Sequence, residues 1–89
     1  MKYSVFLHPK ANASLKKLDK TTRERITEKF KSLEDSPQQK GERLQPSEYY
    51  KLRVGDYRVI YEIWHKEQKV VVLFIGHRSK VYDDFNKLI

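Results

Sequence analysis

The sequence predicts a small α+β domain in which a helical hairpin packs on an antiparallel β-sheet. Two early segments carry apolar residues at helical spacing, and three later segments are rich in β-branched and aromatic residues. A chain of 89 residues has room for one hydrophobic core. The expected order is β-α-α-β-β-β with a C-terminal arm, in a single domain over residues 1–89.

The first strand is expected over Lys2–Leu7, an alternating segment, and Pro9 then stands where a helix can begin. Ala11, Leu15 and Leu18 fall at i, i+4 and i+7, which places them on one face of that helix. A short amphipathic helix is therefore predicted after the first strand.

A second helix is predicted to begin at Thr21, because Thr21 and Glu24 match a capping box. A tight connection at Asp19-Lys20 would make the two helices antiparallel, and Pro37 would stop the second one. Its apolar positions repeat the spacing of the first helix: Ile26, Phe30 and Leu33.

The rest of the chain predicts the sheet. The polar stretch from Pro37 to Pro46 is interpreted as a loop. Gly55 stands at the first central position of a two-residue turn, as a type II′ hairpin requires. The tail, Ser79–Ile89, is expected to form a short helix or an extended arm. Three segments bounded by turn residues are the predicted strands: Tyr49–Val54, Tyr57–Trp64 and Lys69–Ile75.

Composition narrows the class of protein. The chain has no cysteine and its 3 histidines lack ligand-like spacing, so neither a disulfide framework nor a metal site is expected. No signal-peptide pattern or membrane-spanning run occurs, which predicts a cytoplasmic protein without a membrane partner. The formal net charge of +7 is typical of nucleic-acid binders, but also of small proteins that merely stay soluble.

A two-residue turn would place Arg53 directly opposite Arg58. Like charges at such positions destabilise a sheet, whereas favourable cross-strand pairs contribute roughly 0.2–1 kcal/mol. A bound anion would offset the cost. Alternatively, both guanidinium groups extend into water or pair with Glu48 or Glu62.

Gly76-His77-Arg78 follows the most apolar strand and is expected near this arginine pair. A four-residue loop over His65–Gln68 sends His77 to the arginine face, whereas a five-residue loop sends Arg78 there. The sequence leaves both registers open, and a lone histidine is more often structural than catalytic.

These segments together resemble a known family. The stretch Tyr50–Tyr61, which reads YKLRVGDYRVIY, is followed by Gly76-His77-Arg78 and Val81-Tyr82. This combination resembles the RelE/ParE toxin superfamily, and RelE-type toxins in particular. The order of elements agrees with a RelE-like fold over essentially the full length.

The resemblance implies the toxin of a type II toxin-antitoxin system, acting as a ribosome-dependent mRNA endonuclease. In that family the RNA 2′-hydroxyl attacks the neighbouring phosphate without a metal or other cofactor. The implied partners are the ribosome, mRNA and a RelB-like antitoxin, which is acidic and partly disordered. By position, the catalytic site falls on five residues: Lys51, Arg53, Arg58, Arg78 and Tyr82.

Residue chemistry suggests roles within that implied site. Lysine loses its proton more readily than arginine, so Lys51 is expected to accept the proton of the attacking hydroxyl. The guanidinium groups of Arg53 and Arg58 suit the charge that develops on phosphate, although well-studied bacterial RelE has lysine where this chain has Arg53.

Arg78 is expected to neutralise or protonate the leaving 5′-oxygen, with His77 as an additional acid, and Tyr82 to stack on a base. Two alternatives remain at this point. One is a ParE-like toxin that inhibits DNA gyrase without cutting RNA. The other is a catalytically inactive module that binds RNA or its antitoxin.

Overall fold

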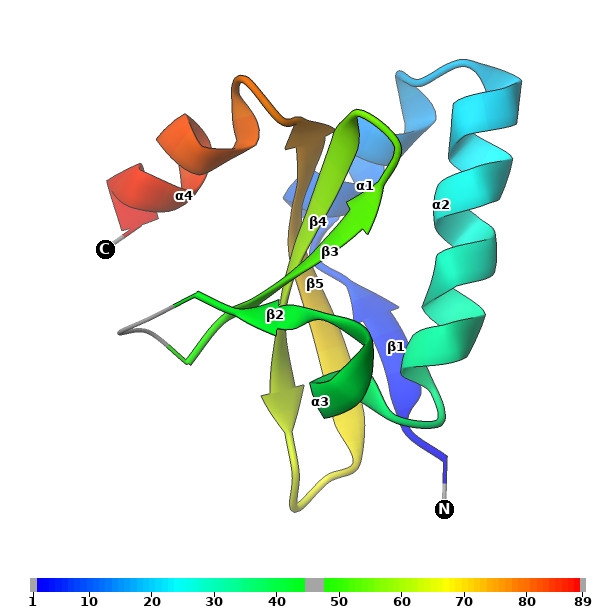
Figure 1. Cartoon of the computed structure of the whole chain (residues 1–89), viewed down its shortest axis with the longest axis vertical. Helices are drawn as coiled ribbons and strands as arrows, with labels where there is room; N and C mark the ends of the chain where they lie inside the picture. The colour runs from blue at the N-terminus through cyan, green and yellow to red at the C-terminus, as the bar shows by residue number, and fades with distance from the viewer. Residues whose placement is uncertain (1, 45–47, 89) are drawn as a thin grey trace.

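A five-stranded sheet in the order β1-β5-β4-β3-β2 forms the centre of the computed structural model, which describes residues 2–44 and 48–88 (Figure 1). The strands are β1 (Ser4–Leu7), β2 (Glu42–Arg43), β3 (Tyr50–Val54), β4 (Tyr57–Trp64) and β5 (Lys69–His77). The helices are α1 (Pro9–Lys16), α2 (Lys20–Leu33), α3 (Pro37–Lys40) and α4 (Val81–Leu88).

The predicted α+β class is confirmed, with one difference in the sheet. β1 lies beside β5 and runs parallel to it, whereas the other neighbouring strands are antiparallel. Among the described residues, none of the helices has the length and apolar character that a bilayer crossing requires. The C-terminal arm is helical as α4, although Ile89 lies outside the described residues.

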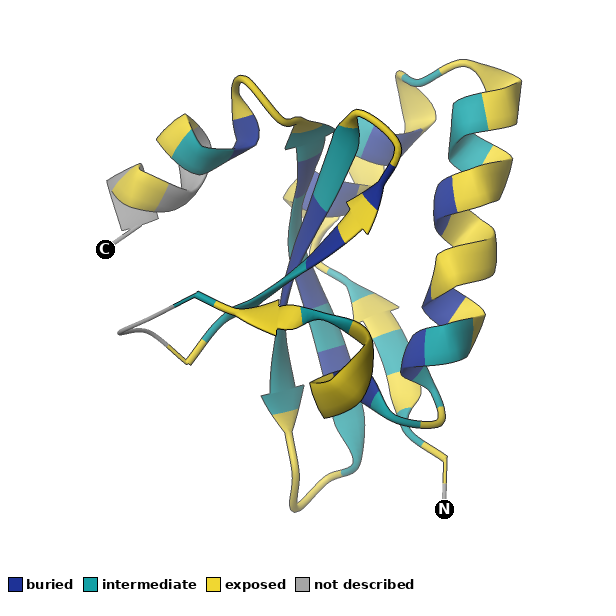
Figure 2. Cartoon of the chain, viewed as in Figure 1, coloured by how far each residue is buried: buried dark blue, intermediate teal, exposed yellow. Residues whose placement is uncertain are grey.

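α1 and α2 cover one face of the sheet, and the predicted apolar stripes form the core there (Figures 1 and 2). Burying a large aliphatic or aromatic side chain stabilises a fold by about 1.5–3 kcal/mol relative to leaving it exposed. From the helices the buried residues are Ala11, Leu15, Ile26, Phe30 and Leu33. From the strands they are Leu52, Val54, Val59, Tyr61, Val70, Val72 and Ile75.

The predicted capping box at the start of the second helix is wrong. α2 begins at Lys20, and the Asp19 carboxylate caps it by accepting hydrogen bonds from the Thr22 backbone N–H at 3.1 Å and the Thr22 hydroxyl at 2.6 Å. These two bonds hold the pKa of Asp19 below its ordinary value. Thr21 therefore lies inside the first turn, where its hydroxyl has no capping role.

The prediction of a loop from Pro37 to Pro46 is also wrong over most of its length, since α3 and β2 occupy 37–40 and 42–43. The buried Tyr61 hydroxyl donates to the Pro37 carbonyl at 2.6 Å. Gly41 lies so close to β3 that a Cβ on it would be 2.6 Å from the Lys51 carbonyl oxygen. These long-range contacts, which local polarity does not reveal, order the segment. Gln45 and Pro46 lie outside the described residues.

The β3–β4 hairpin has the predicted register. Arg53 lies opposite Arg58, and Gly55 has a φ of +60° while Asp56 does not enter the positive region, as a type II′ turn requires. This φ favours glycine because it has no Cβ.

The β4–β5 pairing contains a β-bulge, so the prediction that a four-residue loop sends His77 to the arginine face is wrong. Trp64 pairs with Lys69 across the expected four-residue loop, but the register shifts at Ile60/Tyr61. Tyr61 lies opposite Val72 and Ile60 opposite Phe74, so β5 has one extra residue between them. As a result Arg58 faces Gly76, not Ile75, and His77 faces Tyr57.

We predict that Tyr61→Phe lowers the free energy of unfolding by about 1–3 kcal/mol, because the buried Pro37 carbonyl loses its hydrogen-bond donor. Burial raises the pKa of Tyr61, which keeps this hydroxyl protonated and able to donate. Urea denaturation measures the change. Tyr50→Phe is the matched control, since Tyr50 stacks on Tyr61 but its hydroxyl makes no hydrogen bond within the described residues. Equal losses in both variants would contradict the assignment.

Candidate functional site

The face of the sheet opposite α1 and α2 carries the predicted basic residues. Lys51 and Arg53 alternate with core residues of β3, so they point away from the helices. Cross-strand neighbours lie on the same face: Lys51 pairs with Ile60, Arg53 with Arg58, and Arg58 with Gly76. α4 packs on the β5 side of this face (Figure 1). The sheet and α4 thus bring these cations together beside a helix.

Lys51 joins three elements of this site. Its Nζ lies 3.4 Å from the Glu42 carboxylate on β2 and 5.9 Å from the centroid of the Tyr82 ring on α4. The second distance falls within the usual range of a cation–π contact. The Lys51 side chain is 22% exposed, so this environment is partly screened from water.

Glu42 is a site residue that the sequence analysis missed. It reaches Lys51 because β2 pairs with β3 in a register that sets the two residues directly opposite each other. Opposite charges at such positions stabilise a strand pair. The local sequence offered little signal, since a two-residue strand inside a polar segment lacks a detectable period.

Tyr82 owes its position to its neighbour in α4. Val81 is 1% exposed and is buried against Ile60, with Phe74 and Tyr82 packed around the pair. A Cβ on Gly76 would lie 3.5 Å from the Val81 Cβ, which shows how closely α4 approaches β5. This small second core fixes the first turn of α4 and so holds the half-buried Tyr82 ring beside Lys51.

The opposed arginines differ in their environments. Arg58 Nη1 donates to the carbonyl oxygens of Gly55 and Tyr57, each at 2.8 Å. Arg53 is exposed and forms no hydrogen bond or ion pair with any residue in the described ranges. Within those same ranges neither arginine pairs with Glu48 or Glu62. Arg53 is therefore a free cation, whereas Arg58 is held against the turn.

Arg78 and His77 lie at the end of β5 but on different sides. The Arg78 backbone N–H donates to the Asp56 carbonyl at 2.9 Å, so this exposed residue lies beside the β3–β4 turn that Arg58 contacts. The His77 ring makes an edge contact with Tyr57, with 5.7 Å between centroids, and its Nδ1 lies 2.9 Å from the Ser79 hydroxyl. The bulge thus places His77 on the face of α1 and α2, away from Lys51.

This arrangement has the chemistry of a phosphate-binding site with an aromatic platform. Lysine and arginine donors can bind phosphate oxygens, and a tyrosine ring can stack on a base. Glu42 adds a carboxylate, which contacts Lys51. In the part of the chain that the structure describes, no group of three or more His, Cys, Asp or Glu side chains could hold a metal ion.

Comparison with known proteins identifies the family. The sequence profile of a family described as the ParE toxin of type II toxin-antitoxin system, parDE, matches residues 5–82. No curated protein sequence gave a significant match.

Solved structures of RelE toxins are similar to this chain. The RelBE2 complex from Mycobacterium tuberculosis gives a TM-score of 0.81 at 28% identity, covering 88% of this chain and 100% of that one. The RelE–RelB complex from Pyrococcus horikoshii gives 0.77 at 30% identity, covering 90% and 99%. A free E. coli RelE variant gives 0.82 at 28% identity, covering 100% and 99%.

The profile match spans most of this chain, and each structural match covers nearly all of this chain and of the similar toxin. They agree with the fold described above. Several of the similar toxins are seen in complex with a RelB antitoxin, which supports a cognate antitoxin as partner. The chain therefore belongs to the ParE toxin family of type II toxin-antitoxin systems, within the RelE/ParE superfamily, and has the fold of RelE.

Proposed function

We propose that this toxin is an endoribonuclease that cuts mRNA on the ribosome and so inhibits translation. The observation that carries the proposal is the gathering of Lys51, Arg58 and Tyr82 on one face, with Arg53 beside them and Arg78 at its end. A module that only binds its antitoxin has no need to set a tyrosine ring against a lysine at the edge of an arginine cluster.

The proposed reaction is transesterification within the RNA strand. The 2′-oxygen forms a bond to the adjacent phosphorus, and the bond from phosphorus to the 5′-oxygen breaks. The products are a cyclic phosphate and a 5′-hydroxyl. One proton leaves the 2′-hydroxyl and one reaches the 5′-oxygen, so the site requires an acceptor, a donor and groups that stabilise charge on the phosphorane.

We assign proton acceptance to the Lys51–Glu42 pair instead of to Lys51 alone. An ammonium group cannot accept a proton, whereas the carboxylate 3.4 Å away can. Arg53 and Arg58 face each other across the hairpin and supply donors for the non-bridging oxygens. Arg78 serves the leaving oxygen, and Tyr82 aligns the nucleotide by stacking. His77 has no role in this scheme, because it lies on the opposite face.

We expect Glu42→Gln to lower the single-turnover rate of cleavage by about 10²-fold, the lower end of what a positioned acid or base contributes. Glutamine keeps the size of the side chain, and a single-turnover rate measured at saturating toxin is independent of any change in substrate affinity. Quench-flow measurement on ribosomes programmed with mRNA tests this, with Glu48→Gln as control. An unchanged rate in the Glu42 variant would return proton acceptance to Lys51.

Arg78→Ala should reduce cleavage by about 10²-fold or more, because the charge that develops on the leaving oxygen loses its partner. Primer extension on mRNA translated in a reconstituted system, with and without ribosomes, gives the readout. Lys80→Ala is the matched control, since Lys80 is also exposed and lies only two residues away.

The same assay separates the competing functions. Absence of cuts from folded wild-type protein, together with inhibition of DNA gyrase in a supercoiling assay, would favour the alternative of a ParE-like toxin. Absence of both activities would leave a module that only binds RNA or the antitoxin.

We further propose that the cognate antitoxin is acidic and partly disordered, and that it covers the basic face. Association should then weaken as salt rises, because exposed charge pairs are screened within about 10 Å at 0.1 M. Calorimetric titration of Arg53→Glu against wild-type toxin should show weaker binding with a smaller dependence on salt. Lys20→Glu, on α2, should behave like the wild type; equal losses would place the antitoxin elsewhere.

A further inference from the structure

A groove runs along the outer edge of β3 and reaches the catalytic cluster at one end. It consists of two hollows of about 490 and 290 Å³ that share Lys29 and Arg53 as lining residues. The first lies between α2 and the β3–β4 turn, and Gly55 lines it. The second continues past β3 to β2, where Glu42 and Lys51 line it. The groove thus leads directly to the candidate site.

Five cations line this edge groove: Arg25, Lys29, Lys40, Lys51 and Arg53. All except Lys51 are exposed, and among the residues 2–44 and 48–88 Lys51 alone of the five forms an ion pair, with Glu42. The acidic residue Glu28 also lines the first hollow, yet it too stays outside ion-pair distance. Positive charges gathered without partners repel one another, and a bound polyanion would offset that cost.

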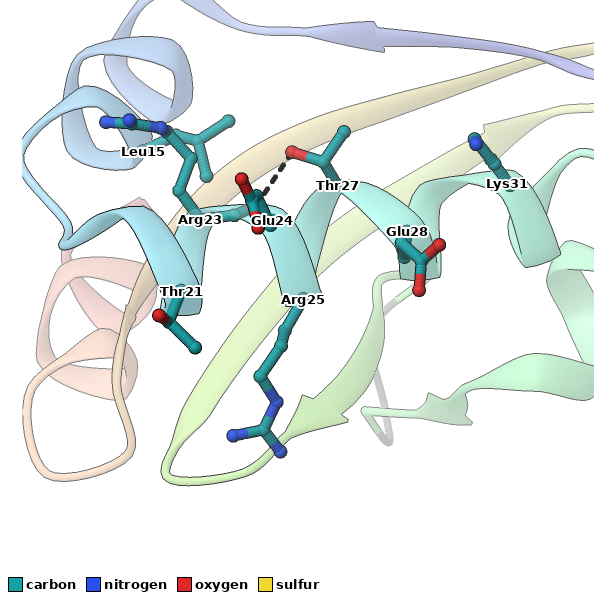
Figure 3. Close-up of a pocket in the computed structure, with 8 residues that line it drawn as sticks. All are labelled: Leu15, Thr21, Arg23, Glu24, Arg25, Thr27, Glu28 and Lys31. Carbon is teal, nitrogen blue, oxygen red and sulfur yellow. Dashed lines mark hydrogen bonds between the residues drawn. The ribbon is translucent and has the colours of Figure 1, made fainter.

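Arg25 is directed into the groove by the shape of the turn. Its Nη2 would lie 3.5 Å from a Cβ on Gly55, so the guanidinium group rests over the glycine. In the close-up of the neighbouring surface hollow, Arg25 extends from α2 toward the β3–β4 turn, apart from Arg23 and Lys31 (Figure 3). Arg25 therefore belongs to the groove and not to the outer surface of α2 alone.

The spacing of these cations suits a chain of phosphates. Arg25 and Lys29 are one helical turn apart, about 6 Å along the helix axis at 1.5 Å per residue. This is comparable to the separation of successive phosphates in an extended strand. β2 pairs only with Tyr50 and Lys51, so within the described residues no strand covers the outer edge of Leu52–Val54. A peptide strand could pair there, but the charged lining favours a polyanion over side chains that need apolar pockets.

We infer that the edge groove binds the phosphate backbone of the RNA on one side of the nucleotide held at the candidate site. The groove would lengthen the bound segment without reading bases, because Lys and Arg contacts to phosphate carry no sequence information. That the polyanion is RNA rests on the proposed function, whereas the groove and its free cations are features of the fold.

The test measures binding and not cleavage, so it can succeed or fail independently of the nuclease activity. Fluorescence anisotropy at several salt concentrations uses oligoribonucleotides of about four and about twelve nucleotides, whose 2′-O-methyl groups prevent cutting. Arg25→Gln/Lys29→Gln should reduce the salt slope for the long strand by about 1.4, or about 0.7 per cation, and leave binding of the short strand unchanged.

Lys20→Gln/Lys31→Gln is the control, because it makes the same charge change on α2 outside the groove. Glu28→Gln should strengthen binding of the long strand, since it removes a negative charge from the lining. Equal effects of the two double variants would show that RNA binding depends only on net charge, which would overturn the inference. So would a wild-type protein that binds both strands equally or neither, or a groove variant that loses only antitoxin binding.

Cleavage on ribosomes is assayed in parallel. If the wild type binds the long strand more tightly, the groove variant loses that preference and the wild type does not cut mRNA, the groove proposal stands and the nuclease proposal fails. If the wild type cuts mRNA but binds both strands equally, the nuclease proposal stands and the groove proposal fails.

Discussion

The hydrogen bond from the Tyr61 hydroxyl to the Pro37 carbonyl is the interaction on which the site depends most. It ties the polar segment after α2 to the middle of the sheet, where Gly41 allows the backbone to lie against β3. β2 then forms beside β3 and carries Glu42 to Lys51. A buried tyrosine on the core face thus determines the electrostatic environment of a lysine on the opposite face.

The bulge in β5 is the second constraint, because it decides which residues share a face. A regular ladder from the four-residue loop would have directed His77 toward the arginines. The extra residue between Val72 and Phe74 moves the end of β5 by one position and brings Gly76 opposite Arg58 instead. Val81, which anchors α4, packs directly on this position of β5, where a Cβ on Gly76 would lie in van der Waals contact with it at 3.5 Å. The bulge and the packing of Val81 on β5 together place Tyr82 beside Lys51.

The sequence predicts well where structure is decided locally. The apolar stripes of α1 and α2 and the β3–β4 register follow from spacing and from the turn at Gly55, because a two-residue turn fixes its own pairing. It fails where distant contacts decide. β2 exists through Tyr61, and a bulge leaves no mark on the period of a continuous apolar run. Asp19 and Thr21 are both possible N-cap residues of α2, and the helix begins after Asp19 because its carboxylate accepts hydrogen bonds from Thr22.

The position of Arg53 is unfavourable for the stability of the sheet but favourable for the binding of an anion. It opposes Arg58 on one side and lies near Lys29 along the groove on the other, without a carboxylate partner among the described residues. A fold selected for stability alone would place an acidic side chain at such a position, since like charges across a strand pair are unfavourable. Leaving the cation free preserves its attraction for phosphate, and a charge that phosphate can neutralise is equally open to an acidic antitoxin. Under the function proposed above, the same unpaired positive charge serves both the binding of substrate and the silencing of the toxin.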